Sequence, residues 1–533
     1  MTARQALWAL IAISTSLRLG WAASLGPGND EAYHYLFALH TDWSYIDHPP
    51  MLAAVETVGL MLAGGRASPF ALRLGFVALF SGSTWLMARL TSRYFGAWAG
   101  VLAAFGLNVA PYYAAAAGAF ALPDGPFLFF WLLTVEALGQ AIESPDALLR
   151  WAAVGIAWGG AMLSKYLAVF LPIGAFLYFA SGPESRRCLR RPGPYLAFTL
   201  GLLVFSPVLW WNLRHGWASF AFQGGRALGG SRFRPDTLLA AIGGQALYLS
   251  PWIWASLLVI LARRVRGWSV GSVAAVERLL LCLAAPPLAL FAAVSCTRPV
   301  LPHWSLVGLL PLFPLLGAGW AAKLHVRPGR MHRVFAIYAA VPAAAVALAA
   351  IQAHTGFVPI APDPTADFYG WDQVASELSR RGLPGPDGAF LFTSRWYHSG
   401  QLAFATGGDA PVFCYNTHHA QGFAFWSRPE ESVGRDGIFV GVNDCGAEVA
   451  YFSRWFSRVE PLGEFPVLRG GQPVRRIHLY RFVRQTKPFP FGNTAAAARS
   501  DPEAQGSSHP PTPGVPAESS NTRRGTRVPD LAW

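Results

Sequence analysis

The first 350 or so residues alternate long apolar runs with short polar segments. About eleven of the runs approach the roughly 20 apolar residues that a helix needs to cross a bilayer. They lie at residues 6–24, 69–88, 97–115, 126–142, 151–164, 166–181, 195–211, 245–262, 279–295, 304–322 and 333–352. This pattern predicts a mainly α-helical polytopic membrane protein with about 11 transmembrane helices. Residues 51–66 are less apolar and contain Glu56, which is more typical of a helix at the membrane surface.

One apolar run, over residues 151–181, is interrupted only by Ser164-Lys165-Tyr166. Each half is short for a bilayer span and both flanks are basic, so the run predicts a helical hairpin with Lys165 near its tip. The hairpin would place an ammonium group inside the protein at membrane depth. Such a charge favours function over the alternative, a lysine that extends to the membrane surface.

The chain changes character after residue 353. Short alternating runs at 389–393 and 437–441, with a helical pattern over 372–381, predict a small mixed α/β domain. Further on, Pro, Ser, Thr, Ala and Arg dominate, which is typical of disorder. The predicted organisation is a transmembrane domain at 1–353, an α/β domain at 354–485 and a disordered tail at 486–533.

Composition and charge support a membrane location. Of 533 residues, 53% are hydrophobic and 13% are charged, against about 25% charged in soluble proteins. The net charge of +13 comes from basic clusters in alternate loops, which indicates positive-inside topology rather than nucleic-acid binding. The N-terminus is therefore predicted to be cytoplasmic, in the cell (inner) membrane. The loop after the first helix and everything after residue 353 are predicted to be extracytoplasmic.

Several kinds of chemistry find no support in the sequence. There is no Walker loop, GxGxxG, HExxH or GxSxG elbow in a suitable context, so ATP-driven transport and serine hydrolysis are not indicated. The five cysteines lack metal-ligand spacing. Cys414 and Cys445 both lie in the C-terminal region, where a disulfide and two free thiols are equally open.

The first extracytoplasmic loop concentrates acids, histidines and aromatic residues. It contains Asn-Asp-Glu-Ala-Tyr at 29–33 and a second group at 42–50 that ends in Asp-His-Pro-Pro. A carboxylate such as Asp30 could accept a proton, hold a metal or cap the next helix. Capping explains one acid, but it does not explain the whole set, which predicts a functional site: Asp30, Glu31, Tyr33, His34, Asp47 and His48.

Two further loops contribute candidates. Asp124, within Leu-Pro-Asp-Gly-Pro, is either a turn residue or a second acid on the same side as Asp30. In the loop at 296–304, Arg298 suits phosphate recognition, and His303 could supply a hydrogen bond or a metal ligand. The alternative for this loop is an Arg/Trp anchor at the membrane interface.

These motifs, in this order, resemble the membrane glycosyltransferases of family 39 and their bacterial relatives that modify lipid A with aminoarabinose. The elements that carry the resemblance are Asn29-Asp30-Glu31-Ala-Tyr33, Asp42 to Pro50, Leu-Pro-Asp124-Gly-Pro, Ser164-Lys165-Tyr166 and Pro299 to Trp304. Those enzymes share the GT-C fold and use polyprenyl-phosphate sugars. The resemblance covers residues 1–350 well and the outer domain more loosely. It implies transfer to a lipid, glycan or protein acceptor on the extracytoplasmic face, among membrane lipids and without nucleic acid.

The resemblance also implies roles for single residues. Asp30 matches the aspartate expected to act as catalytic base, and Glu31 completes the acidic pair. A leaving phosphate gains negative charge, so Lys165 and Arg298 are the candidates to bind the donor phosphate. The residues expected to bind or orient substrate are Tyr33, Asp47, His48, Asp124 and His303. Some GT-C enzymes use a divalent metal, and the sequence leaves a metal requirement open; no other cofactor is indicated.

Two other functions compete with this interpretation. A transporter or flippase of lipid-linked glycans would have pseudo-symmetric halves and ionisable residues in broken helices. The Lys165 hairpin fits that picture weakly, but no internal repeat is visible and the acids cluster near the outer surface. An inactive assembly partner is the other alternative, and the presence of Asp30, Lys165 and Arg298 together argues against it.

Overall fold

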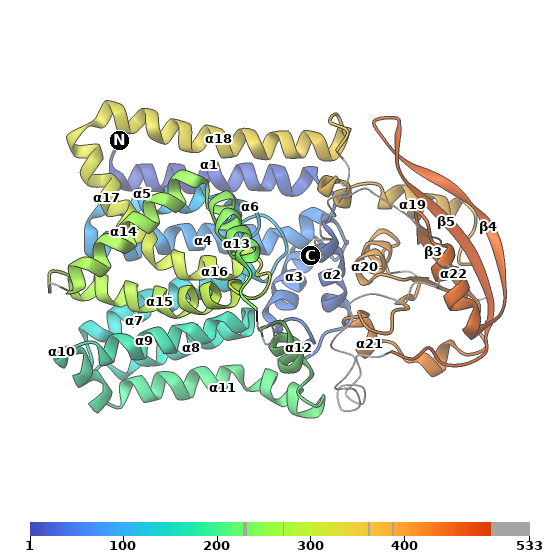
Figure 1. Cartoon of the computed structure of the whole chain (residues 1–533), viewed down its shortest axis with the longest axis horizontal. Coiled ribbons are helices and arrows are strands. Elements are labelled where there is room, and N and C mark those ends of the chain that lie inside the picture. Colours follow the sequence, from blue (N-terminus) through green and yellow to red (C-terminus); the bar gives the residue numbers. More distant parts are fainter. Residues whose placement is uncertain (228–231, 270, 361–362, 386–387, 409, 492–533) are drawn as a thin grey trace.

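The computed structural model describes residues 1–491, apart from 228–231, 270, 361–362, 386–387 and 409. A bundle of helices forms one end of the molecule and a domain built on a β-sheet forms the other (Figure 1). The tail predicted at 486–533 lies outside the described residues from 492 onward. The domain boundaries at 353 and 485 stay predictions.

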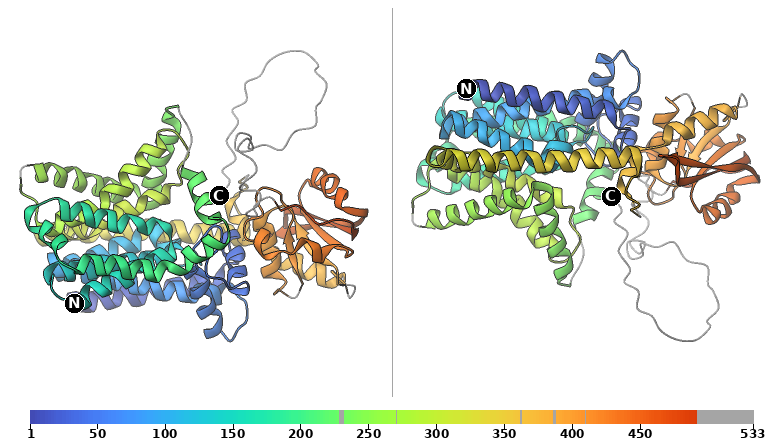
Figure 2. Two further views of the ribbon diagram at one scale, coloured as in Figure 1. Left: turned by 90° about the horizontal axis from the view of Figure 1, so that it is seen from below. Right: turned by 90° about the horizontal axis from the view of Figure 1, so that it is seen from above.

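The helical bundle comprises residues 3–355. Its elements in chain order are α1 (Ala3–Ser24), α2 (Asn29–Leu39), α3 (Met51–Leu62), α4 (Pro69–Phe95), α5 (Ala97–Val109), α6 (Pro111–Ala115), α7 (Asp124–Glu143), α8 (Leu148–Ser164), η1 (Tyr166–Val169), α9 (Phe170–Ala180), α10 (Pro183–Arg186), η2 (Arg187–Arg190), α11 (Gly193–Arg214), α12 (Ala218–Ala227), α13 (Pro235–Leu249), α14 (Pro251–Ser269), α15 (Ala275–Ser295), α16 (Pro302–Leu309), η3 (Leu310–Leu312), α17 (Phe313–Val326) and α18 (Pro328–Thr355). The last of these helices, α18, runs along the outside of the bundle toward the sheet domain (Figure 2).

The described helices confirm a multi-pass membrane protein. Seven are long and apolar enough to cross a membrane, or up to nine if each of two bent helix pairs counts as one span. The predicted count of about 11 is not confirmed, because several apolar runs fold into shorter helices. The run at 97–115 is divided at Pro111 into α5 and α6, and α8 has 17 residues.

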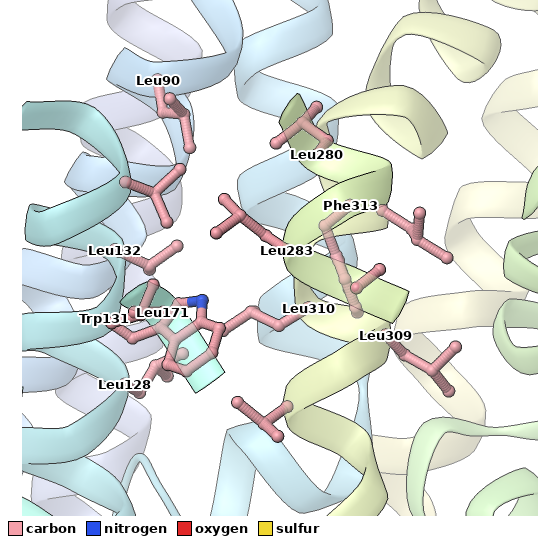
Figure 3. Close-up of a cluster of buried hydrophobic side chains, with 14 of the residues drawn as sticks. Leu90, Leu128, Trp131, Leu132, Leu171, Leu280, Leu283, Leu309, Leu310 and Phe313 are labelled. Carbon is pink, nitrogen blue, oxygen red and sulfur yellow. The ribbon is translucent and has the colours of Figure 1, made fainter. Parts of the chain in front are cut away.

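The core of the bundle consists of apolar side chains that face one another between helices. Figure 3 shows part of this core, with Trp131 of α7, Leu171 of α9, Leu283 of α15 and Leu310 of η3 among its buried side chains. Helices approach closely where glycine faces a neighbouring backbone: a Cβ on Gly317 would lie 2.3 Å from the Ala99 carbonyl oxygen. Close approach at small residues replaces the hydrophobic driving force, which is weak between helices in lipid.

The hairpin predicted over 151–181 is present. Helix α8 ends at Ser164, Lys165 is extended, and η1 and α9 lead the chain back. Lys165 therefore lies at the turn of the hairpin, as the sequence predicted.

The sheet domain comprises residues 364–485 and confirms the predicted α/β character. Its sheet has five strands in the order β2-β1-β3-β5-β4, in which β1 runs parallel to β2 and β3, and β5 runs antiparallel to β3 and β4. The elements are η4 (Pro364–Phe368), α19 (Trp371–Arg380), β1 (Phe390–Thr393), α20 (Trp396–Ala405), β2 (Val412–Cys414), α21 (Phe423–Trp426), η5 (Pro429–Ser432), β3 (Gly437–Val442), α22 (Gly446–Phe452), η6 (Ser453–Trp455), β4 (Phe456–Arg469) and β5 (Gln472–Gln485). Cys414 and Cys445 are both buried and free.

Candidate active site between the bundle and the sheet domain

The predicted acidic pair lies in the first turn of α2, at the end of the bundle that faces the sheet domain (Figure 1). The helix begins after Pro27-Gly28, and the Glu31 carboxylate accepts a hydrogen bond from the Gly28 N–H at 2.9 Å. In a capping box, the side chain of the third helical residue accepts a hydrogen bond from the backbone N–H of the N-cap residue, and Glu31 makes this bond to Gly28. Two acids in the first turn also interact favourably with the positive end of the helix dipole. Local sequence therefore accounts for where α2 starts.

Glu31 is buried and fully engaged by internal partners. Arg73 of α4 reaches its two carboxylate oxygens at 2.8 and 2.6 Å, and the Ala121 N–H donates to it at 2.9 Å. Arg73 also donates to the carbonyl oxygens of Ala22, Leu25 and Gly26. The carboxylate thus joins α2, α4 and the segment before α7. This arrangement favours a positioning role for Glu31 over a direct part in chemistry.

Arg73→Met is expected to lower the free energy of unfolding by about 3–5 kcal/mol, because it leaves the Glu31 carboxylate buried without its cation. Arg73 and Glu31 are only 1% and 2% exposed. The control is Arg428→Met, which removes an exposed i,i+3 pair with Glu431 and is expected to cost less than about 1 kcal/mol. Thermal unfolding in detergent measures both. Equal shifts in the two variants would contradict the anchoring role.

Asp30, the neighbouring acid, is exposed on the same turn. It lies in electrostatic range of Asp367 in η4, from the sheet domain. Burial raises the pKa of Asp367 above its ordinary value; Arg475 opposes that shift, and the charge of Asp30 adds to it. The more exposed of the two predicted acids is therefore the one available to a substrate.

Tyr33, Asp47 and His48 lie together beneath this turn. The Tyr33 hydroxyl accepts a hydrogen bond from the Gly422 N–H at 2.8 Å and is also hydrogen-bonded to Asp47. Burial and, second, the charge of Asp47 raise the pKa of Tyr33 well above its ordinary value, so the phenol stays protonated. His48 packs edge-on against His34 with ring centroids 5.3 Å apart. The structure thus brings together three of the predicted substrate-binding residues.

A second group forms around the tip of the hairpin. The Lys165 Nζ lies 2.7 Å from Asp124 Oδ1, and the two side chains are 14% and 13% exposed. The Tyr112 hydroxyl also donates to Asp124, and its ring stacks on His303 with centroids 5.6 Å apart. Tyr112, Asp124 and His303, together with Leu167, line a small pocket. Asp124 and His303, predicted from separate loops, therefore meet in one pocket, and Lys165 is held beside them by its ion pair with Asp124.

The two groups are joined through Tyr166, the residue after Lys165. Its hydroxyl lies 2.9 Å from Ser219 Oγ, is hydrogen-bonded to Ser44, and is in electrostatic range of Asp47. Ser219 in turn donates to Asn212 at 2.7 Å. Lys165 therefore contacts the group around Asp124, while the next residue, Tyr166, reaches the group that contains Asp47.

Arg298 occupies a different position from His303, although both come from the loop before α16. Its guanidinium approaches the Gly225 carbonyl oxygen of α12 at 3.5 Å. The structure thus places Arg298 against α12, whereas His303 joins the Lys165–Asp124 pair. A phosphate-binding role for Arg298 stays a prediction.

Several residues of the site were not anticipated from the sequence. Arg73 carried a signal, because a charge inside an apolar run is costly and marks a constrained position. Tyr112 and Asp367 carried none, since their importance depends on partners far away in the chain. Within the described part of the chain, no group of three or more His, Cys, Asp and Glu side chains could hold a metal ion.

Glu56 of α3 is an unusual buried acid next to this site. It is fully buried, and neither carboxylate oxygen has a hydrogen-bond partner among the described residues. Helix α3 has 12 residues, too few to cross a bilayer. Burial, and second the charge of Glu31, raise the pKa of Glu56 well above its ordinary value of 4.5. Burial therefore favours the neutral form of Glu56 in the folded protein.

Glu56→Gln is expected to stabilise the protein increasingly as the pH rises above about 4.5. In wild type, the unfolded state loses the Glu56 proton in this window while the folded state keeps it, so folding is penalised by about 1.4 kcal/mol per pH unit. The variant lacks this penalty. Thermal unfolding at pH 5 and pH 8 should show a gap between the proteins that widens at pH 8. A gap independent of pH would contradict the raised pKa of Glu56.

Comparison with known proteins finds a family model that matches part of the helical bundle. Residues 47–211 match the family model of the dolichyl-phosphate-mannose-protein mannosyltransferases. The lipid A galacturonosyltransferase RgtD from Rhizobium johnstonii is 28% identical over 193 residues, which span 35% of this chain and 38% of that relative. The alignment thus covers well under two thirds of the relative's own length.

The likeness to solved structures extends over nearly the whole chain. ArnT from Cupriavidus metallidurans in the apo state has a TM-score of 0.61 and 14% identity, covering 94% of this chain and 100% of that chain. The chain has the GT-C fold. ArnT from the same organism bound to undecaprenyl phosphate has a TM-score of 0.59 and 14% identity, covering 88% and 97% of the two chains. The GT-C fold expected from the sequence is therefore confirmed, and the mannosyltransferase family model matches part of the bundle.

Proposed function

We propose that this protein is a membrane glycosyltransferase that moves a sugar from a polyprenyl-phosphate donor to an extracytoplasmic acceptor. The observation that carries the proposal is the Lys165–Asp124 pair, which places a partly accessible ammonium group next to the pocket that Asp124 lines. The matched mannosyltransferase family and the galacturonosyltransferase relative support transfer chemistry. ArnT, which shares the fold, has been seen bound to undecaprenyl phosphate.

The donor side of the proposed site is the region of Lys165 and the pocket lined by Asp124 and His303. The Lys165 ammonium binds the donor phosphate and stabilises the negative charge that develops as the lipid phosphate leaves. Asp124 and Tyr112 hold Lys165 in place, while His303 and Arg298 supply further contacts to the phosphate. A cation here suits the chemistry, because the phosphate of a polyprenyl lipid lies at headgroup depth.

The acceptor side is the first turn of α2. The acceptor oxygen forms a bond to the anomeric carbon while the bond from that carbon to the phosphate oxygen breaks. Asp30 takes the acceptor proton, and polyprenyl phosphate leaves with inversion at the sugar. Tyr33, Asp47 and His48 orient the acceptor, and Glu31 fixes the turn that carries Asp30. If the acceptor is itself a phosphate, Asp30 mainly positions it.

The proposal also includes the membrane in which the protein lies and its orientation across that membrane. The protein lies in the cell (inner) membrane with a cytoplasmic N-terminus, so that the turn with Asp30 and the sheet domain are extracytoplasmic. Alternation of basic loops along the chain supports this orientation.

Donor consumption by the purified protein tests the proposal. Wild type in detergent, supplemented with a host membrane extract, is incubated with a panel of radiolabelled polyprenyl-phosphate sugars. We expect one donor to be consumed, with release of an equal amount of polyprenyl phosphate and a labelled product that mass spectrometry identifies. If no donor turns over while reconstituted vesicles move lipid-linked glycan across the bilayer, the protein is a flippase and the proposal is wrong.

A further inference from the structure

The junction between the bundle and the sheet domain is tightly fixed around one amide side chain. Gln401 of α20 is 1% exposed. Its Nε2 donates to the Pro27 carbonyl oxygen at 2.9 Å, to Asn29 Oδ1 at 3.2 Å and to the Asp367 carbonyl oxygen at 3.1 Å. One side chain of the sheet domain therefore ties the turn that begins α2 to η4.

Backbone packing leaves this junction little freedom. A Cβ on Gly400 would lie 2.7 Å from Tyr33 Cα, so α20 rests directly on the backbone of α2. A Cβ on Gly26 would lie 2.4 Å from the Phe368 carbonyl oxygen. Both glycines are thus required by close approach, and the sheet domain is docked on the turn that carries Asp30.

The docked segment brings a second carboxylate to Asp30. The Asp367 side chain is hydrogen-bonded to Asn29, the residue before Asp30, and is in electrostatic range of Asp30 itself. The other charged or titratable groups that act on Asp367 or feel its charge are Arg475 of β5, Asp363 before η4 and Tyr397 of α20. Two carboxylates close together each take up a proton more readily than either would alone.

We propose that the sheet domain completes the active site, with Gln401 and Asp367 as positioning residues for Asp30. Gln401 fixes the first turn of α2, and Asp367 presents its carboxylate beside Asp30. The sheet domain is then part of the catalytic unit rather than an appended module that only captures acceptor. This inference rests on the proposed function, because it assigns Asp30 as the base.

Two variants separate the two contributions. Gln401→Ala should lower kcat by about 10- to 100-fold with little change in KM for the donor, because misplacement of a catalytic group costs rate rather than binding. Asp367→Asn keeps the shape but removes a charge, so it should move the acid limb of the pH–rate profile to lower pH by about half a unit or more. A role confined to folding would lower thermal stability without moving the acid limb.

Matched controls lie in the same domain. Gln373 of α19 exchanges hydrogen bonds with the backbone of Leu468 inside the sheet domain, at 2.8 and 3.0 Å. Gln373→Ala therefore removes the same side chain without touching the α2 turn. Asp372→Asn removes an exposed charge from the same helix. Both controls are expected to keep the kcat and the pH profile of wild type.

The outcomes distinguish this inference from the proposed function. If wild type consumes a donor but the acid limb of Asp367→Asn coincides with that of Asp372→Asn, the role of Asp367 is wrong. Hydrogen–deuterium exchange over residues 25–32 tests Gln401 without any activity: exchange should be faster in Gln401→Ala than in Gln373→Ala. Equal exchange in the two variants overturns the positioning role. Absence of donor turnover in wild type counts against the proposed function alone.

Discussion

Asp30→Asn is expected to lower the rate of sugar transfer by about 10²–10⁴-fold while the protein stays folded, since loss of a general base typically costs this much. The amide cannot accept the acceptor's proton. The substitution is nearly isosteric at an exposed position in the first turn of α2, so packing is preserved. Turnover of the labelled donor measures the effect, and an unchanged KM for the donor would place the loss in the chemical step.

The adjacent acid provides the control for this experiment. Glu31→Gln leaves the buried Arg73 guanidinium without its carboxylate partner, so it should lower the unfolding temperature, which Asp30→Asn should not. Comparison of the two variants separates loss of a proton acceptor from loss of structure. Retention of more than half of the activity by Asp30→Asn would show that another group accepts the proton, and Asp47 would be the next of the predicted residues to test.

Much of the architecture could be predicted because it depends on local sequence. Apolar runs mark helices by length, and the interruption at Lys165 marked the hairpin tip. Clustering of Asp30 with Tyr33, Asp47 and His48 within one loop indicated a site, and the structure brings the last three together beneath the turn of Asp30. The number of spans was less predictable, because Pro111 and short helices divide runs that hydropathy alone treats as whole.

The rest of the site depends on contacts between distant segments. Glu31 and Asp30 are neighbours of the same type, and only the partner Arg73, 42 residues away, distinguishes the buried anchor from the exposed acid. Gln401 bonds to Pro27 across 374 residues, and no local pattern marks a glutamine for such a role. Arg298 and His303 share a loop, yet the chain turns them toward different neighbours.

Lys165→Met is expected to lower kcat/KM for the donor by about 10²–10³-fold, the typical cost of removing one donor to a developing negative charge. The variant loses the ammonium and leaves the Asp124 carboxylate in the pocket, so a neutral pair becomes a net negative charge that repels phosphate. KM for the donor should therefore rise and kcat should fall. Lys165→Arg keeps the charge and should retain much more activity than Lys165→Met. Turnover measured at several donor concentrations gives both KM and kcat.

The double variant Lys165→Met/Asp124→Asn tests the electrostatic argument. With both charges removed, the repulsion disappears, so KM for the donor should recover toward wild type while kcat stays low for want of a cation. Because the two side chains are in contact at 2.7 Å, their effects should not add. If Lys165→Met keeps donor turnover within about threefold of wild type, the ion pair holds the hairpin in place without binding phosphate, and the cation for the leaving group must come from elsewhere, with Arg298 the next residue to test.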